Sequence, residues 1–207
     1  STKTFKTYQL KITISGLPVW RRLLVRGDMN LGLLHAVIQV ALGWTNSHLH
    51  QFTIGTKRYS DQSIQDAMDF GVPPDLDEKK AVLMEVVPRV KTKFIYEYDF
   101  GDSWVHLITV EKIHEPDALR NGFAECIDGS CACPPEDCGG IGGYEDLLEI
   151  TKDSAHEEHD SMMEWLGGQF DPEAFDSKKI NSYLGKLKWP RTTESQLAKV
   201  LMKRDGF

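Results

Sequence analysis

Several features that would point to a membrane, a nucleic acid or secretion are missing from this sequence. No apolar run approaches the roughly 20 residues that span a bilayer, and residues 1–6 do not resemble the apolar part of a signal peptide. Positive charge is scarce, because 24 Lys and Arg stand against 31 Asp and Glu, for a formal net charge of −7. Phosphate contacts need a surplus of cations, so nucleic acid is an unlikely partner. We expect a cytoplasmic protein with no membrane contact, and neither its ligand nor its protein partner is indicated.

The sequence also lacks the standard catalytic signatures. It has no Walker phosphate loop, no G-x-G-x-x-G motif after a strand, no G-x-S-x-G nucleophile elbow and no H-E-x-x-H zinc motif. Its four cysteines all lie between residues 126 and 138, whereas a secreted disulfide scaffold would distribute them along the chain. These absences leave open whether the protein is an enzyme.

Hydrophobic periodicity predicts strands mainly in the first half of the chain. Residues 8–14 alternate apolar and polar side chains, as a half-buried strand does, and residues 19–25 are expected to pair with them. Residues 94–98 and 104–110 alternate in the same way on either side of a Gly-Asp turn signal, which predicts the clearest hairpin of the sequence. Residues 48–54 are expected to form a further strand.

Helices are predicted at residues 31–42 and through the last third of the chain. Residues 31–42 carry an apolar stripe between the capping residue Asn30 and the terminating Gly43. Residues 144–151 predict a short helix. Three further helix starts are indicated by capping signals at Ser154-x-x-Glu157, Asp171-Pro172 and Thr193-x-x-Gln196.

These elements predict an α+β fold. We expect an antiparallel sheet, packed by the helix at 31–42 and by helices of the C-terminal third, with no βαβ rhythm that would indicate a parallel sheet. Residues 1–207 are expected to form a single domain. Within it, residues 115–143 are rich in Cys, Pro and Gly and are predicted to be a loop without a long element, and residues 144–207 to be a helical part.

The four cysteines are the first candidate site. Thiolates are good zinc ligands, and a metal would order a loop that is too polar to build a core. The spacing C-x4-C-x-C-x4-C is not the usual C-x2-C pattern, and Cys131 and Cys133 are too close in sequence for all four to bind one ion comfortably. Three cysteines and a histidine are therefore the more relaxed arrangement. The alternatives are reduced thiols in a packed loop, or one disulfide.

Histidines and carboxylates in three segments are further candidates. His48 and His50 would share one face of the strand at 48–54 and could bind one metal ion or line one pocket, although both could equally be structural. Asp99, Asp102 and His106 surround the hairpin turn and could form an acid–base or metal trio, although Asp beside Gly is also ordinary turn chemistry.

The third segment lies on a predicted helix in the last third of the chain. His156 and His159 share a helix face there with Asp160 and could supply a metal ligand. A solvated acidic helix start is the alternative.

Taken together, these segments resemble the plasmid pRiA4b ORF-3-like family, over about residues 8–184. The segments that carry the resemblance include Tyr8-Gln-Leu-Lys-Ile, Val19-Trp-Arg-Arg, Leu34-His-Ala-Val-Ile-Gln, His48-Leu-His-Gln-Phe, Tyr96-Glu-Tyr-Asp-Phe-Gly-Asp-Ser-Trp-Val-His, Cys133-Pro-Pro-Glu-Asp-Cys-Gly-Gly and Trp165-Leu-Gly-Gly-Gln-Phe-Asp-Pro-Glu-Ala-Phe-Asp. The resemblance brings no catalytic residues with it. The family pattern resembles C…C-P-P-E-D-C-G-G, which implies that Cys126, Cys133 and Cys138 are the shared cysteines and that Cys131 is an addition.

Some members of this family carry a resolvase label, which implies a DNA-associated accessory protein of plasmid recombination. The chemistry of this chain does not favour that role. A serine recombinase needs an activated serine with a cluster of arginines, and here Arg21-Arg22 is the only adjacent arginine pair in an acidic chain.

Our leading hypothesis is a binding module with an aromatic and polar cleft. The cleft would be lined by Trp20, Trp44, His48, His50, Asp99, Asp102, Trp104 and His106. The alternative is a metal-dependent hydrolase that uses the same His and Asp residues. In either case we expect the sulfurs of Cys126, Cys133 and Cys138 to converge within about 4 Å as ligands of a structural metal, zinc above all. The fourth ligand would be Cys131, His156 or His159.

Overall fold

The structure, a computed structural model, describes residues 5–62, 75–115, 118–119, 122–168 and 170–202. Its centre is an eight-stranded sheet of strand order β5-β4-β3-β6-β7-β1-β2-β8. The strands are β1 (Thr7–Ile14), β2 (Trp20–Arg26), β3 (His50–Ile54), β4 (Lys57–Ser60), β5 (Leu76–Asp77), β6 (Lys93–Tyr98), β7 (Trp104–His114) and β8 (Ala124–Ser130). Every neighbouring pair is antiparallel except β4 and β5, which are parallel. The predicted α+β class is confirmed.

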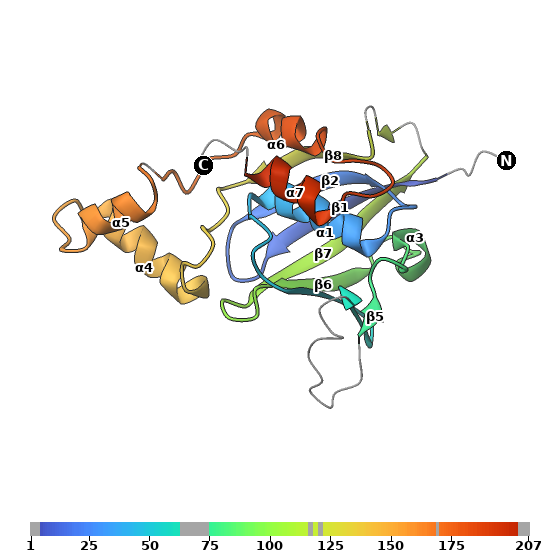
Figure 1. The fold of residues 1–207 in the computed structure, drawn as a ribbon, viewed down its shortest axis with the longest axis horizontal. Coiled ribbons are helices and arrows are strands. Elements are labelled where there is room, and N and C mark those ends of the chain that lie inside the picture. Colours follow the sequence, from blue (N-terminus) through green and yellow to red (C-terminus); the bar gives the residue numbers. More distant parts are fainter. Residues whose placement is uncertain (1–4, 63–74, 116–117, 120–121, 169, 203–207) are drawn as a thin grey trace.

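The helices of the described residues lie mainly against one face of this sheet. They are α1 (Leu31–Leu42), α3 (Leu83–Val86), α4 (Gly140–Lys152), α5 (His159–Trp165), α6 (Ser177–Leu184) and α7 (Glu194–Leu201). Helix α1 crosses the sheet, with α6 and α7 beside it, while α4 and α5 lie together beyond one end of the sheet (Figure 1). None of the helices in the described part of the chain has the length and apolar character needed to cross a membrane.

Helix α1 forms the centre of the core and confirms its sequence prediction. The side chain of Asn30 accepts a hydrogen bond from the backbone N–H of Leu33 at 2.8 Å. Gly43 ends the helix in the left-handed conformation, with φ 102°, and its N–H donates to Gln39 O at 2.9 Å. Every residue of the helix except Gly32 is buried, because the sheet covers one side and the C-terminal helices contact another.

The edge strand β8 corrects the prediction of a loop at residues 115–143. Residues 124–130 pair with β2 in antiparallel register through backbone hydrogen bonds. Cys126 is the only fully buried side chain of this strand. An edge strand bonded through its backbone needs little apolar alternation, so the periodicity of the sequence could not identify it.

The helix boundaries in the last third also differ from the prediction. Helix α4 begins at Gly140 and includes two more glycines, so it starts before the first strongly apolar residue. The Ser154 signal caps no helix, because α5 begins at His159, and the helix expected at Asp171 begins instead after Asp176, whose side chain accepts from two backbone N–H groups. The capping box at Thr193 is confirmed.

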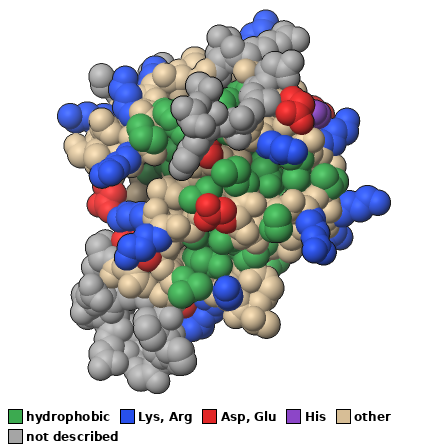
Figure 2. All heavy atoms as spheres, turned by 90° about the vertical axis from the view of Figure 1, so that its right-hand side faces the viewer, with side chains coloured by type: hydrophobic (Ala, Val, Ile, Leu, Met, Phe, Trp, Pro, Cys, Tyr) green, Lys and Arg blue, Asp and Glu red, His purple; other side chains and the backbone are tan. Residues whose placement is uncertain are grey.

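The face of the molecule on the α3 side lies opposite the α4–α5 pair. Hydrophobic side chains gather across the middle of this face, with Lys and Arg around them (Figure 2). Met84 and Val86 of α3 pack against the core, and Val90 is 44% exposed. The polar clusters described next lie elsewhere, at the ends of β3, β6 and α1.

Candidate functional site

A short segment of the Cys- and Pro-rich region crosses the ends of α1 and β6. We call residues 133–139 the strap. The indole Nε1 of Trp44 donates a hydrogen bond to Pro134 O at 3.0 Å. The Glu136 carboxylate accepts from the Thr45 backbone N–H at 2.9 Å and from the hydroxyls of Thr45 and Tyr98. These contacts hold the strap in place although it contributes few apolar side chains.

The far end of the strap is attached to the hairpin turn between β6 and β7. The Gly139 N–H donates to the Asp102 carboxylate at 3.1 Å. Gly140, with φ 68°, comes so close to this turn that an added Cβ would lie 2.7 Å from Asp102 O. Gly143 is equally restricted, since its Cβ would lie 1.9 Å from Cys138 O. Gly140 therefore lets the backbone approach the hairpin turn, and Gly143 lets α4 approach the strap.

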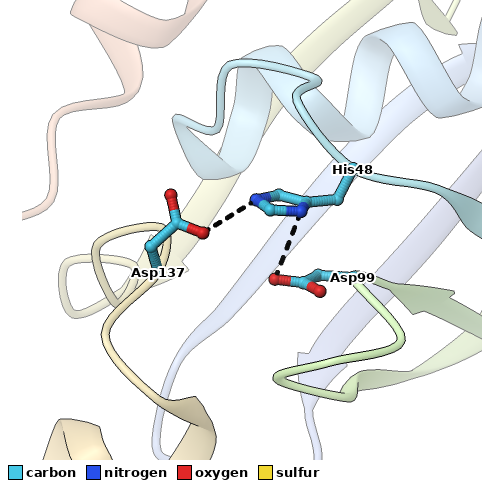
Figure 3. Close-up of side chains that lie close together, drawn as sticks. All are labelled: His48, Asp99 and Asp137. Atoms are coloured by element: carbon cyan, nitrogen blue, oxygen red, sulfur yellow. Dashed lines mark ion pairs between the residues drawn. The ribbon is translucent and has the colours of Figure 1, made fainter.

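His48, Asp99 and Asp137 form the one group in the described residues with three or more His, Cys, Asp or Glu ligand atoms within 4.8 Å of one another. We call it the strap site. The ring of His48 lies between the two carboxylates (Figure 3). Its Nδ1 is 3.6 Å from Asp99 Oδ2, and its Nε2 is 3.1 Å from Asp137 Oδ1. Three separate segments thus contribute one side chain each: the α1–β3 connection, the β6–β7 turn and the strap.

The three side chains of the strap site differ in how firmly they are held. Asp99, in the left-handed conformation with φ 57°, accepts from Gly101 N–H through Oδ1 at 2.9 Å, which leaves Oδ2 directed toward His48. The His48 side chain is 27% exposed and that of Asp137 is 70% exposed. The contact between His48 Nε2 and Asp137 lacks hydrogen-bond geometry, so this buried nitrogen has no hydrogen-bond partner among the described residues. The site is therefore fixed at Asp99 and open at Asp137.

Three residues of the predicted cleft lie behind the strap in the core. Trp44, Trp104 and His106 are 2%, 1% and 0% exposed, so they do not line an open cleft. The rings of Trp44 and His106 meet edge to face at 5.2 Å, and Trp44 also stacks on Tyr98 at 4.9 Å. Burial lowers the pKa of His106 to about 4, so it is neutral at pH 7. Trp44 supports the strap directly, and Trp104 and His106 pack against Trp44. Trp20 lies elsewhere, beside Lys11 and Arg22.

His50 does not join His48, which corrects the expectation of a shared strand face. Strand β3 begins at His50, so the alternation of strand side chains does not extend to His48. The His50 ring stacks on His35 with centroids 3.5 Å apart, and its Nε2 lies 2.7 Å from Glu78 Oε2. His35 in turn hydrogen-bonds to the Tyr96 hydroxyl at 2.8 Å. We call these four residues the buried network.

Burial shifts the pKa values of the buried network and keeps its two histidines neutral at pH 7. Burial lowers the pKa of His35 to about 3 and that of His50 to about 4, and it raises the pKa of Glu78 to about 7. The predicted site residues do not include His35 or Glu78. The signal for His35 is its position in the middle of a helix that is apolar on nearly every side. The sequence around Glu78 is polar, and nothing in it indicates a buried carboxyl group.

The four cysteines do not form the expected ligand set. All are free thiols, and no three of them meet the 4.8 Å distance that identifies the strap site, so the prediction that Cys126, Cys133 and Cys138 converge is wrong for this structure. Burial raises the pKa of Cys126 to about 11 and that of Cys138 to about 12, which keeps both protonated at pH 7. Metal binding by a rearranged cysteine segment stays a prediction.

The two histidines predicted as a fourth metal ligand beside the cysteines contact their own sequence neighbours instead. His156 Nδ1 accepts from Glu158 N–H at 3.1 Å, and His159 Nδ1 lies 3.2 Å from Asp160 Oδ1. Neither histidine belongs to a three-residue ligand group in the part of the chain that the structure describes. His159 is the first residue of α5, and His156 precedes that helix.

Comparison with known proteins identifies the family. Residues 6–179 match the family model of the plasmid pRiA4b ORF-3-like proteins. The chain belongs to this family. It is 34% identical over 195 residues to the uncharacterized protein y4hQ of Sinorhizobium fredii (strain NBRC 101917 / NGR234), with 88% of this chain and 94% of that protein covered. The family match over residues 6–179 includes the strap and both strands of the β6–β7 hairpin, as the resemblance in the sequence implied.

A solved structure extends this likeness to the fold. The crystal structure of MM3350, a protein of unknown function from Methanosarcina mazei Go1, superimposes with a TM-score of 0.73 at 34% identity. The alignment covers 85% of this chain and 98% of that one. The family and the fold are therefore established, and the relatives' names assign no activity.

Proposed function

We propose that this protein is a binding module that holds a divalent metal ion with His48, Asp99 and Asp137. The observation that carries the proposal is the convergence of three ligand atoms within 4.8 Å from three separate segments of the chain. Hydrogen bonds to the strap and to the hairpin turn hold two of these segments in position. An ion would join the three segments more firmly and so stabilise the strap against the sheet.

The donor set suits a first-row transition metal. One imidazole and two carboxylates combine a nitrogen ligand with hard oxygen ligands, which fits zinc or manganese. The buried Nε2 of His48 lacks a hydrogen-bond partner in the described residues and faces Asp137, so it is the nitrogen available to the ion. Asp99 lies on the other side of the ring, beside Nδ1, from which a carboxylate commonly orients a metal-binding histidine.

Calorimetric titration of chelator-treated protein with zinc and with manganese tests the proposal. We expect one ion per chain, and a loss of affinity of about tenfold or more in His48→Ala and Asp137→Asn. His156→Ala and Asp128→Asn are matched controls outside the strap site and should bind as the unmodified chain does. Retained binding in His48→Ala, together with loss in Cys133→Ser, would overturn the proposal in favour of a cysteine site.

Metal-dependent hydrolysis is a second candidate that the exposure of the strap site favours. The Asp137 side chain is 70% exposed, so an ion held there would keep coordination positions open to water, as catalytic zinc sites do. A hydrolase screen with added zinc or manganese tests it. Activity that disappears in His48→Ala and persists in His50→Gln supports this candidate, and activity lost equally in both does not.

The proposed place of action is the cytoplasm, with a partner other than nucleic acid. All four cysteines are thiols, as is usual in a reducing compartment. The net charge of −7 opposes contact with phosphate backbones. Binding to duplex DNA at about 0.15 M salt, with a steep dependence on salt, would contradict the second part of this proposal.

A further inference from the structure

A separate cavity lies between the C-terminal helices and the end of the sheet, away from the three residues of the strap site. Its volume is about 860 Å³, within the range of about 300–1,000 Å³ that is typical of small-molecule sites. Residues of α4, α5 and the segment 170–180 form its walls. The cavity wall also includes Arg21 of β2, a residue that neither the metal proposal nor the buried network uses.

Arg21 is a buried charge without an acidic partner. It is 2% exposed, and its guanidinium donates to three backbone carbonyls: Nε to Ala41 O at 3.0 Å, and Nη1 to Trp20 O at 2.8 Å and Ser130 O at 2.9 Å. Nη2 makes no hydrogen bond with any residue that the structure describes. No carboxylate of those residues lies within 4.0 Å of the guanidinium, in contrast to the neighbouring Arg22, which pairs with both Glu111 and Asp128.

A purely structural role explains only part of this arrangement. Ala41 lies in the last turn of α1, where carbonyl groups favour a nearby cation. Carbonyl groups carry no net charge, however, and a buried guanidinium that lacks an anion is costly. An anion that enters the cavity would reach the unused nitrogen and offset this cost.

The other walls of the cavity are aromatic and apolar, which favours an anion that carries an apolar group. Phe170, Phe175 and Met163 face the cavity, and the guanidinium carbon of Arg21 lies 5.0 Å from the centre of the Phe175 ring. This ring packs directly on Gly129, where an added Cβ would be 2.4 Å from it, so the aromatic wall is firmly placed beside the charge.

The charges that line the cavity leave a small positive surplus. Arg21, Lys152 and Lys179 oppose Asp171 and Asp176, three cations against two carboxylates. The Asp171 carboxylate accepts from Glu173 N–H, and that of Asp176 accepts from the first N–H groups of α6. Both acids are thus engaged in local turns and caps, and neither pairs with Arg21.

We propose that this cavity binds a small organic carboxylate with an apolar body, the carboxylate on Arg21 and the body against Phe170, Phe175 and Met163. One free guanidinium nitrogen offers a single contact, which suits a carboxylate better than a phosphate that needs several donors. This inference does not depend on the proposed metal site, because none of the metal ligands lines the cavity.

Calorimetric and NMR titrations with octanoate test the proposal. Octanol is the uncharged probe of the same chain length, and inorganic phosphate is the anion without an apolar chain. We expect octanoate to bind and to shift the Arg21 Nε–H resonance, and octanol and phosphate to bind at least about tenfold more weakly. His48→Ala should bind octanoate as the unmodified chain does, which separates this result from the outcome at the strap site. Equal affinity for octanol and octanoate, or no octanoate binding at millimolar concentration, overturns the proposal.

Two pairs of variants locate the contact. Arg21→Gln should lower octanoate affinity by about tenfold or more, while Lys57→Gln on β4 should not change it. Because Arg21 also bonds to three carbonyls, Arg21→Gln can fail to fold, so a second pair decides independently. Met163→Glu places a negative charge at the partly buried cavity wall and should weaken octanoate binding by about tenfold relative to the isosteric Met163→Gln. Equal affinity in the two Met163 variants overturns the proposal.

Discussion

Two polar sites lie on either side of the start of β3, and they differ in how completely their side chains are enclosed. In the buried network, His50 stacks on His35 and meets Glu78, with exposures of 9%, 5% and 2%. In the strap site, His48 lies between a fixed Asp99 and an exposed Asp137, and one of its ring nitrogens lacks a hydrogen bond within the described residues. A closed polar cluster stabilises a fold, whereas an incomplete one at the surface is suited to a ligand.

The largest expected effect is the difference in the free energy of unfolding between variants of His50 and of His48. His50→Ala should lower the free energy of unfolding by about 3–4 kcal/mol, because it leaves a cavity beside His35 and a buried Glu78 without its partner. His48→Ala in metal-free protein should lower it by less than about 1 kcal/mol, because its side chain is partly exposed and makes no strong hydrogen bond. Urea unfolding of both variants measures the difference. Equal losses would mean that the strap site is as much a part of the core as the buried network.

A second comparison concerns the glycines that follow the strap. Gly143→Ala should destabilise the protein by about 2–3 kcal/mol, because the new Cβ would lie 1.9 Å from Cys138 O and would push α4 away from the strap. Gly142→Ala, one residue earlier in the same helix, meets no atom within 4 Å and should be neutral or stabilise by about 0.5–1 kcal/mol. Thermal unfolding of the pair is the measurement. If Gly143→Ala is as stable as Gly142→Ala, the strap does not hold α4 where the structure places it.

The buried network also predicts a dependence of stability on pH. The pKa values of His35, about 3, and His50, about 4, lie below their ordinary value of 6.5, so only the unfolded state takes up these protons as the pH falls below about 6.5. Stability is therefore lost on acidification. Glu78 has the opposite effect, because its pKa is raised from 4.5 to about 7 and the folded state keeps its proton over that range. The stability that Glu78 contributes is therefore gained on acidification and lost as the pH rises toward 7.

The two histidines of the network outweigh its one carboxyl group, so we expect the network to contribute a net loss of about 2 kcal/mol between about pH 7 and pH 4.5. His106, whose pKa is also lowered to about 4, adds a further loss over this range. Urea unfolding across this range measures it. His50→Gln should make the loss smaller, whereas His114→Gln, far from the network, should leave it unchanged. A steeper loss in His50→Gln than in the unmodified chain would contradict the neutral form of His50.

The smallest expected effect is at the attachment of the strap. Glu136→Gln keeps the size of the side chain but replaces a charged acceptor of the Thr45 and Tyr98 hydrogen bonds with a neutral one. The free energy of unfolding should fall by about 1 kcal/mol. Zinc affinity should fall as well, since Glu136 precedes Asp137. Glu145→Gln, on the exposed side of α4, is the control, and an unchanged zinc affinity in Glu136→Gln would show that the strap needs no fixed position to bind metal.

Much of the fold could be predicted because its signals are local. The alternation of residues 8–14 and 94–98 and the capping residues of α1 each depend on neighbours within a few positions, and each is confirmed. Strand β8 could not be predicted in this way, since its pairing with β2 uses backbone groups that every sequence has. The same limit applies to α4, which begins at glycines whose value lies in their approach to the hairpin turn and the strap.

The candidate sites show a similar division. Residue type identifies His48 and Asp99 as candidates, and composition identifies the segment Cys133 to Cys138, but nothing in the sequence indicates that Asp137 is the third member of the strap site. The prediction that groups His50 with His48 is wrong because strand alternation does not extend to the two residues before the strand begins. Arg21 stands out in the sequence only as one of an arginine pair, and nothing local distinguishes its burial from the partly exposed, ion-paired position of Arg22.

The family, the α+β class and the residue types that carry polar chemistry can be read from local pattern and composition. Which of those residues meet depends on the packing of the elements. The strap crosses from β8 to α4 over the ends of α1 and β6, and this path brings Asp137 to a histidine 89 positions earlier in the chain. Contacts between segments so far apart depend on how elements pack against one another, and no local pattern encodes that arrangement.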